Sequence, residues 1–195
     1  KADENLTVFR DPARELENYG SLRNGYLSSL KNIAHLKKNE IFGSLGDDAL
    51  ANIVENSERM VFEKNTDIVT EDSDGNTMYI IIQGVVEIFK VINVKEMMVG
   101  RLKSGDFFGE MSLLTGEKRS ATVRANSQVE VLEVSKYAME QAFKKFPDLY
   151  DDLSLVVSER LKLIALMEKN AETEVSHKFL NFDDLKAKIV SFFRS

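Results

Sequence analysis

The chain has 195 residues, of which 43% are hydrophobic and 30% charged, a balance typical of a globular domain that buries a core. It contains no cysteine, which excludes a disulfide framework and a thiolate metal site and fits a cytoplasmic location. The net charge of −6 disfavours unspecific binding to nucleic acid, and no apolar run approaches the ~18 residues of a membrane span.

The N-terminal part has a helical pattern, and residues 1–38 are predicted to form a helical extension. Asp11 and Pro12 make a favourable helix start, because Asp caps free N–H groups and Pro has no N–H to leave unsatisfied. Another short helix is predicted over residues 49–57, with acidic residues at its positive end. Because the chain begins with Lys1 rather than Met, we expect it to be a fragment of a longer protein.

From Arg59 to Val134 the apolar runs are short, rich in Val and Ile, and separated by turn residues, which is typical of strands. Strands are predicted over residues 59–64, 67–71, 78–84, 85–91, 97–102, 121–125 and 129–135. The segment "DSDGN" is predicted to be a turn, with Gly75 available for a positive φ. The pattern predicts an α+β chain built on an antiparallel, jelly-roll-like β-roll of about eight strands with flanking helices.

The helical period returns at Ser135. One helix is predicted over residues 135–146, where Pro147 ends it. A longer helix follows with an apolar stripe, and a last amphipathic helix is predicted over 181–195, within a C-terminal extension at 169–195. The stripe of the long helix comprises Leu149, Leu153, Val156, Val157, Leu161, Ile164 and Met167.

The segment 105–125, "GDFFGEMSLLTGEKRSATVRA", carries the chemistry of interest. Gly109 ahead of "EMSLL" predicts a close backbone approach that leads into a helical turn, whose free N–H groups suit an anion. Arg119 adds a fork of donors that matches phosphate oxygens, and the carboxylate of Glu110 suits a ribose hydroxyl. These groups fit a ligand with adjoining sugar and phosphate. The spacing alone fits equally well a solvated hairpin whose two charges lie on the surface.

This segment resembles the phosphate-binding cassette of the cyclic nucleotide-binding domain family. The matching positions are Phe108, Gly109, Glu110, Ser112, Leu113, Arg119, Ser120, Ala121 and Val123. The resemblance extends over roughly residues 39 to 165, and it implies a binding domain at 39–168 with a lead-in helix, the roll, the cassette at 105–125 and C-terminal lid helices. Two positions depart from the family pattern: Lys118 replaces a Pro, and Asp72-Ser73 replaces a Gly-Asp pair.

The resemblance also implies roles for single residues. Arg119 would bind the exocyclic phosphate and Glu110 the ribose 2′-hydroxyl, with backbone N–H groups near Gly109 and Ala121 completing the phosphate seat. Ser120 lies where family members place a hydroxyl that contacts phosphate or a guanine amino group, so it permits cGMP without requiring it. The full expected ligand-binding set is Val99, Leu102, Phe108, Gly109, Glu110, Met111, Ser112, Arg119, Ser120 and Ala121.

The residues that would close over the base are harder to assign. Leu161 and Ile164 are candidates on the long helix, and a place in the core or in a dimer seam is the alternative for both. The base itself is expected to be adenine rather than guanine.

The resemblance implies a sensor or regulatory domain that binds a cyclic nucleotide, requires no other cofactor, and relays binding by movement of its C-terminal helices. The alternative is a roll that has lost binding and serves as a ligand-independent dimerisation or docking module. We expect no enzyme and no metal site, because His35 and His177 both lie outside the strands. Expected partners are a second copy or a larger effector. Residues 168–195, with five basic and five acidic side chains, are not expected to bind nucleic acid.

Overall fold

The computed structural model describes residues 31–38, 42–169 and 182–194. The helix start predicted at Asp11 lies outside these residues. Residues 31–36 are helical, and the remaining elements are η1 (Phe42–Ser44), α2 (Asp47–Glu55), β1 (Ser57–Phe62), β2 (Asp67–Val69), β3 (Thr77–Gln83), β4 (Val85–Ile92), β5 (Lys95–Lys103), β6 (Phe107–Phe108), α3 (Glu110–Thr115), β7 (Thr122–Ala125), β8 (Val129–Ser135), α4 (Lys136–Lys145), α5 (Leu149–Lys169) and α6 (Phe182–Arg194).

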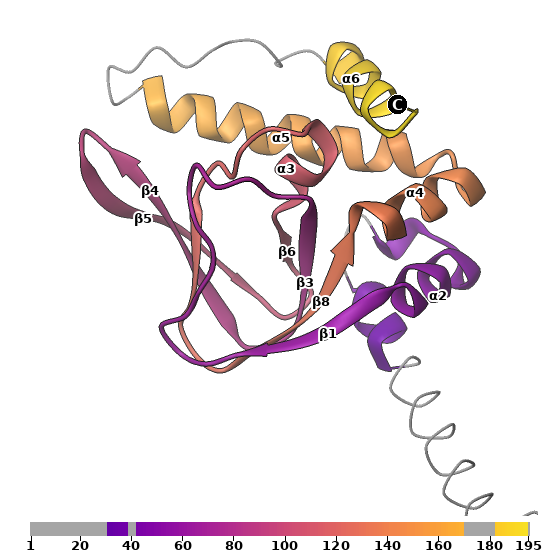
Figure 1. Cartoon of the computed structure of the whole chain (residues 1–195), viewed down its shortest axis with the longest axis horizontal. Helices are drawn as coiled ribbons and strands as arrows, with labels where there is room; N and C mark the ends of the chain where they lie inside the picture. The colour runs from indigo at the N-terminus through magenta and orange to yellow at the C-terminus, as the bar shows by residue number, and fades with distance from the viewer. Residues whose placement is uncertain (1–30, 39–41, 170–181, 195) are drawn as a thin grey trace, which may run out of the picture.

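Eight antiparallel strands form two facing four-stranded sheets, as the sequence pattern predicts (Figure 1). One sheet has the order β1-β8-β3-β6 and the other the order β2-β7-β4-β5. In the second sheet, Val86 of β4 pairs with Ala125 of β7 and with Leu102 of β5. This register places the end of segment 105–125 beside the first half of β4.

The central strand β3 explains why "MYIII" is an uninterrupted apolar run. Side chains alternate between the two faces of a strand, so Met78 and Ile80 contact the helices while Tyr79 and Ile81 face the interior of the roll. A sheet that is buried on both faces needs apolar residues at every position. One core therefore lies between this sheet and the helices, and the other lies inside the roll.

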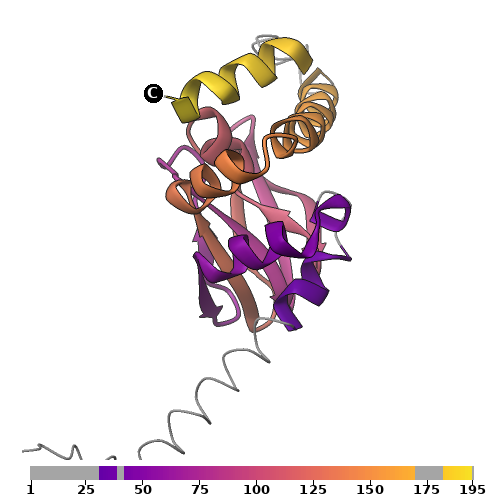
Figure 2. The ribbon, with the colours of Figure 1, turned by 90° about the vertical axis from the view of Figure 1, so that its right-hand side faces the viewer.

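The helices gather on one side of the roll (Figures 1 and 2). Helix α4 begins where Ser135 accepts a hydrogen bond from the Ala138 amide at 3.2 Å, a favourable N-cap. Helix α5 crosses the roll, and its residues Leu149 and Leu153 are fully buried in the domain core. The described part of the predicted stripe therefore packs on its own domain.

Helix α6 packs across α3 and α5. Leu185 and Ile189 are fully buried, and the ring of Phe193 meets Phe143 of α4 edge to face at 4.8 Å. Lys188 pairs with Glu117, which follows α3, at 2.6 Å. The C-terminal helix is thus joined to the segment that carries the predicted cassette.

Two local predictions need correction. The turn over 72–76 places its positive φ at Asp72 (+63°), whereas Gly75 has no positive φ. Strand β6 was not predicted, because two residues are too few to display an alternating pattern. Within the described ranges, no helix is both long and apolar enough to cross a membrane.

Candidate ligand-binding site

A hollow of about 220 Å³ opens between the second sheet, α3 and α5. Its wall is largely apolar, and charged groups reach it from four positions: Lys90, Glu110, Arg119 and Arg160. An apolar cavity with a few polar groups that converge on it is the usual form of a small-molecule site.

The left-handed conformation of Gly109 (φ +82°) creates the polar end of the hollow, since it turns the chain from β6 directly into α3. Glu110 is the first residue of α3 and is only 2% exposed. Its Oε1 accepts a hydrogen bond of 2.6 Å from Nη1 of Arg160 in α5. The other nitrogen, Nη2, donates to the Phe107 carbonyl at 3.0 Å, so Arg160 ties α5 to the start of the cassette.

Arg119 is 6% exposed, and all its side-chain hydrogen bonds go to neutral oxygens. Nη1 donates to the carbonyls of Thr77 (2.7 Å) and Gly109 (2.8 Å), and Nη2 donates to Oγ1 of Thr77 (3.1 Å). Burial lowers the pKa of this guanidinium, and the nearby Tyr79, Glu110 and Glu133 act against that shift. Among the described residues, no carboxylate lies within ion-pair distance of Arg119.

The position of Arg119 is fixed by its backbone and by two glycines. Its N–H donates to the Ser73 carbonyl at 2.8 Å, and its carbonyl accepts from the Asp72 amide at 2.9 Å. The turn that departs from the family pattern therefore holds the arginine by both backbone groups. A Cβ on Gly75 would lie 2.1 Å from Nε, and one on Gly109 would lie 2.6 Å from Nη1. Only glycine leaves room for the guanidinium at these two positions.

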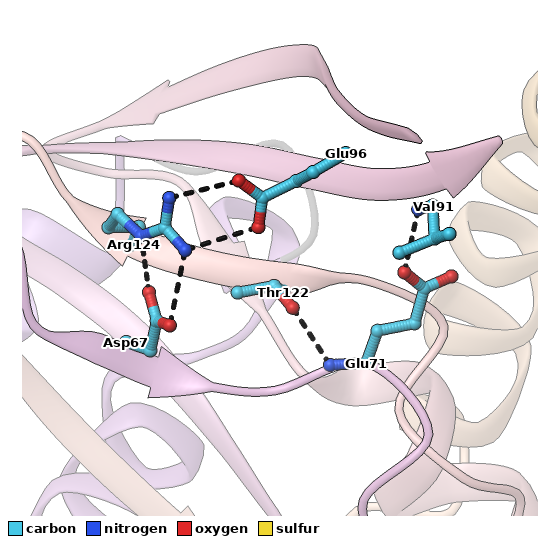
Figure 3. Close-up of polar contacts among 6 residues, drawn as sticks. All are labelled: Asp67, Glu71, Val91, Glu96, Thr122 and Arg124. Atoms are coloured by element: carbon cyan, nitrogen blue, oxygen red, sulfur yellow. Dashed lines mark hydrogen bonds and ion pairs between the residues drawn. The ribbon is translucent and has the colours of Figure 1, made fainter. Parts of the chain in front are cut away.

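Lys90 enters the hollow from β4. Its Nζ lies 3.1 Å from the Ser120 carbonyl and 3.5 Å from Oε1 of Glu71. Glu71 is itself held in place, because its Oε2 accepts from the Val91 amide (2.8 Å) and its own amide donates to Oγ1 of Thr122 (3.0 Å), as Figure 3 shows. The ammonium is therefore attached to both the cassette and the neighbouring strands.

A second brace crosses the same sheet. Arg124 of β7 hydrogen-bonds Asp67 of β2 (2.5 and 3.2 Å) and Glu96 of β5 (3.2 Å for both contacts), so one guanidinium spans three strands (Figure 3). These two carboxylates raise the pKa of Arg124. The ring of Phe89 lies 4.7 Å beneath its guanidinium carbon. The sheet that forms one wall of the hollow is thereby fixed on its outer side.

The structure brings all ten predicted ligand-binding residues to this one hollow: Val99, Leu102, Phe108, Gly109, Glu110, Met111, Ser112, Arg119, Ser120 and Ala121. Leu161 packs against the core beneath α5 and does not line the hollow. The side chain of Ile164 lies outside the described residues. Lys118, the other departure from the family pattern, is exposed.

Two charged residues of the hollow were missed from sequence. Arg160 lies fifty residues from its partner Glu110, and nothing near it in the sequence indicates the pairing. Lys90 did carry a signal, since it interrupts an alternating apolar pattern with Ile88 and Ile92 on either side. The missed apolar lining residues are Val69, Ile88, Ile92 and Val123.

The hollow of this two-sheet roll combines an apolar wall with a buried carboxylate and a buried guanidinium, which suits a small, partly apolar anion. Residues 59–146 match the cyclic nucleotide-binding domain family. This region of the chain belongs to that family, as the resemblance of segment 105–125 implies.

Three related proteins illustrate the match. The chain is 33% identical over 104 residues to the cAMP-activated global transcriptional regulator CRP of Escherichia coli, covering 52% of this chain and 50% of that protein. It is 33% identical over 97 residues to the cGMP-dependent 3′,5′-cGMP phosphodiesterase A of Dictyostelium discoideum, covering 50% of this chain and 11% of that protein. The regulatory domain of Toxoplasma gondii PKA, solved with cAMP, is 27% identical with a TM-score of 0.57, covering 67% of this chain and 51% of that chain.

The chain spans about half the length of the bacterial regulators it matches. Because one of these relatives regulates transcription, the expectation that this protein binds no nucleic acid stays a prediction.

Proposed function

We propose that the chain is a regulatory domain that binds a 3′,5′-cyclic nucleotide in the hollow and relays its binding through α5 and α6. The proposal assigns the chain a binding role and no chemical step. A roll that serves only dimerisation or docking is the alternative.

The environment of Arg119 carries the proposal. A buried guanidinium is costly unless it is paired, and here only neutral oxygens contact it. The other two cations of the hollow each have a carboxylate, Glu110 for Arg160 and Glu71 for Lys90. Within the described part of the chain, one positive charge therefore remains without a carboxylate, which matches the single negative charge of a cyclic phosphodiester. A docking module has no need for this arrangement.

Glu110 supports the sugar end of the ligand. Arg160 engages Oε1, and a carboxylate has two oxygens with several acceptor positions, so Glu110 retains capacity to accept from a ribose hydroxyl. The ligand would thus bind Glu110 while α5 remains attached to it.

The relay rests on two connections that begin at the cassette. Arg160 links Glu110 to α5, and Lys188 links α6 to Glu117 just after α3. A ligand that moves α3 must alter at least one of these two contacts, unless both contacts hold α3 in the position that the ligand favours. Binding and helix position are therefore coupled, and the coupling is reciprocal.

Adenine is the first base to test, because the E. coli relative is activated by cAMP and the T. gondii relative was solved with cAMP. The Dictyostelium relative is named for cGMP, so both nucleotides belong in the experiment. A homodimer and a larger effector remain the proposed partners.

Isothermal titration calorimetry tests the proposal with cAMP, cGMP and a cyclic dinucleotide on the wild type and on Arg119→Leu. We expect saturable binding of a cyclic mononucleotide and a loss of at least a hundredfold in the variant, as is typical of removing one partner of a desolvated charge pair. Arg101→Leu is the matched control, because Arg101 pairs with Glu87 on the exposed side of β5. If the wild type binds none of these ligands, or the Arg119 variant retains its affinity, the docking module becomes the better account.

A further inference from the structure

Strand β4 presents an unusual inner face to the hollow. Its alternating residues Ile88, Lys90 and Ile92 all line the cavity, so a lysine occupies the centre of an apolar stripe. The Lys90 side chain is only 20% exposed. Lysine is rarely buried without a functional or structural reason, because removing an ammonium from water is costly.

Lys90 is held in place rather than free to leave toward solvent. The Ser120 carbonyl and Glu71 both contact its Nζ, and Glu71 is fixed by the Val91 amide and Thr122. These contacts hold the ammonium at the cavity wall.

The apolar residues around Lys90 form the wall of the hollow that would contact the base. Val99 and Leu102, on the adjacent strand β5, line the same wall as Ile88 and Ile92. An apolar wall suits the faces of a purine ring, whereas the phosphate is served by Arg119 and the start of α3. A polar group in this wall therefore meets an edge of the base.

We propose that Lys90 is a specificity-determining residue that favours a purine with a carbonyl at position 6 over adenine; this inference rests on the proposed function. An ammonium only donates hydrogen bonds. Guanine offers two acceptors on its outer edge, O6 and N7, whereas adenine offers N7 beside an amino group, which is itself a donor. Lys90 thus improves the binding of 6-oxo purines relative to adenine, whatever the overall preference of the pocket.

Three nucleotides separate this role from the one implied for Ser120. Cyclic IMP has the 6-oxo group of cGMP but lacks its 2-amino group. Lys90 acts on the 6-oxo group, so its effect must be shared by cIMP and cGMP. A contact of Ser120 with the 2-amino group affects cGMP alone.

The experiment measures the dissociation constants of cAMP, cGMP and cIMP by calorimetry on the wild type, Lys90→Met and Lys90→Gln. In Lys90→Met, we expect cGMP and cIMP to weaken about tenfold more than cAMP, the order of one base-edge contact. Lys90→Gln retains a donor for the Ser120 carbonyl, and its amide matches the amino and N7 groups of adenine, so the shift toward cAMP should be at least as large. Lys103→Met, an exposed change on β5, is the matched control and should leave all ratios unchanged.

The outcomes are distinct. Ratios of cGMP and cIMP to cAMP that stay constant in both Lys90 variants overturn the inference, and so does an equal loss for all three nucleotides, which would assign Lys90 to the phosphate or to the fold. Lys90→Gln decides the matter if Lys90→Met does not fold, as judged by thermal unfolding. Failure of the wild type to bind any of the three overturns the proposed function itself, and this inference with it.

Discussion

Removing Arg160 while keeping Glu110 should destabilise the fold measurably. In Arg160→Met the carboxylate of Glu110, 2% exposed, loses its 2.6 Å partner, and the Phe107 carbonyl loses its 3.0 Å donor. The guanidinium also leaves the Phe107 ring, whose centroid lies 4.2 Å from its central carbon. Methionine restores only the apolar contact.

The expected cost follows from the burial of the pair. Removing one partner of a fully buried ion pair costs about 3–5 kcal/mol. Because the Arg160 side chain is 28% exposed, water screens part of the interaction, and we expect about 2–3 kcal/mol for Arg160→Met. For a chain of this size that corresponds to a fall in Tm of about 4–12 °C.

Urea denaturation and thermal unfolding measure this cost, with two comparisons. Arg101→Met removes an arginine whose side chain is 61% exposed, and it should cost less than about 1 kcal/mol. The double variant Glu110→Gln/Arg160→Met should recover a large part of the loss, because the Glu110 carboxylate is then no longer left buried without its partner. A cost for Arg160→Met no larger than that of the Arg101 control would refute the reasoning.

Three further predictions concern backbone and charge. Gly75→Ala should weaken cyclic nucleotide binding at least tenfold in calorimetry, because its Cβ would displace the Arg119 guanidinium. The control Gly46→Ala, with no atom within 4 Å of the new Cβ, should leave the affinity unchanged. Equal affinities of the two variants would contradict this prediction. Gly116→Ala should lower the free energy of unfolding by about 1–2 kcal/mol, measured by urea denaturation. Its φ is +72°, and the Phe192 ring of α6 lies 2.7 Å from the new Cβ. An unchanged free energy of unfolding would show that α6 does not pack there. Burial raises the pKa of Glu133, so the folded state binds its proton more tightly and this carboxyl lowers stability as the pH rises above its ordinary titration range near 4. Glu133→Gln should therefore gain stability relative to the wild type with rising pH in urea denaturation, and a constant difference would exclude the effect.

Sequence patterns predicted those parts of the molecule whose signals are local. The run "MYIII" and the patterns of β4 and β8 predict strands from residues that are adjacent in the sequence. Gly109, Glu110 and Arg119 likewise lie within one short segment. The contact of Arg160 with Glu110 is different in kind, because it depends on how α5 crosses the roll. No local rule specifies that crossing.

The turn over 72–76 shows a second limit. Glycine is the residue that most readily takes a positive φ, so Gly75 was the natural choice. The structure uses Asp72 instead, since its amide must meet the Arg119 carbonyl, while Gly75 is needed for the space it leaves beside Nε. The sequence does not distinguish a glycine that leaves space for a distant side chain from a glycine that provides a positive φ in a turn.

A crystal structure of the chain with the bound cyclic nucleotide tests the central claim most directly. The account predicts phosphate oxygens within hydrogen-bond distance of the Arg119 guanidinium, the ribose hydroxyl on Glu110, and the base against Val99 and Leu102. A nucleotide bound outside the hollow, or one inside it whose phosphate contacts neither Arg119 nor the start of α3, would contradict it.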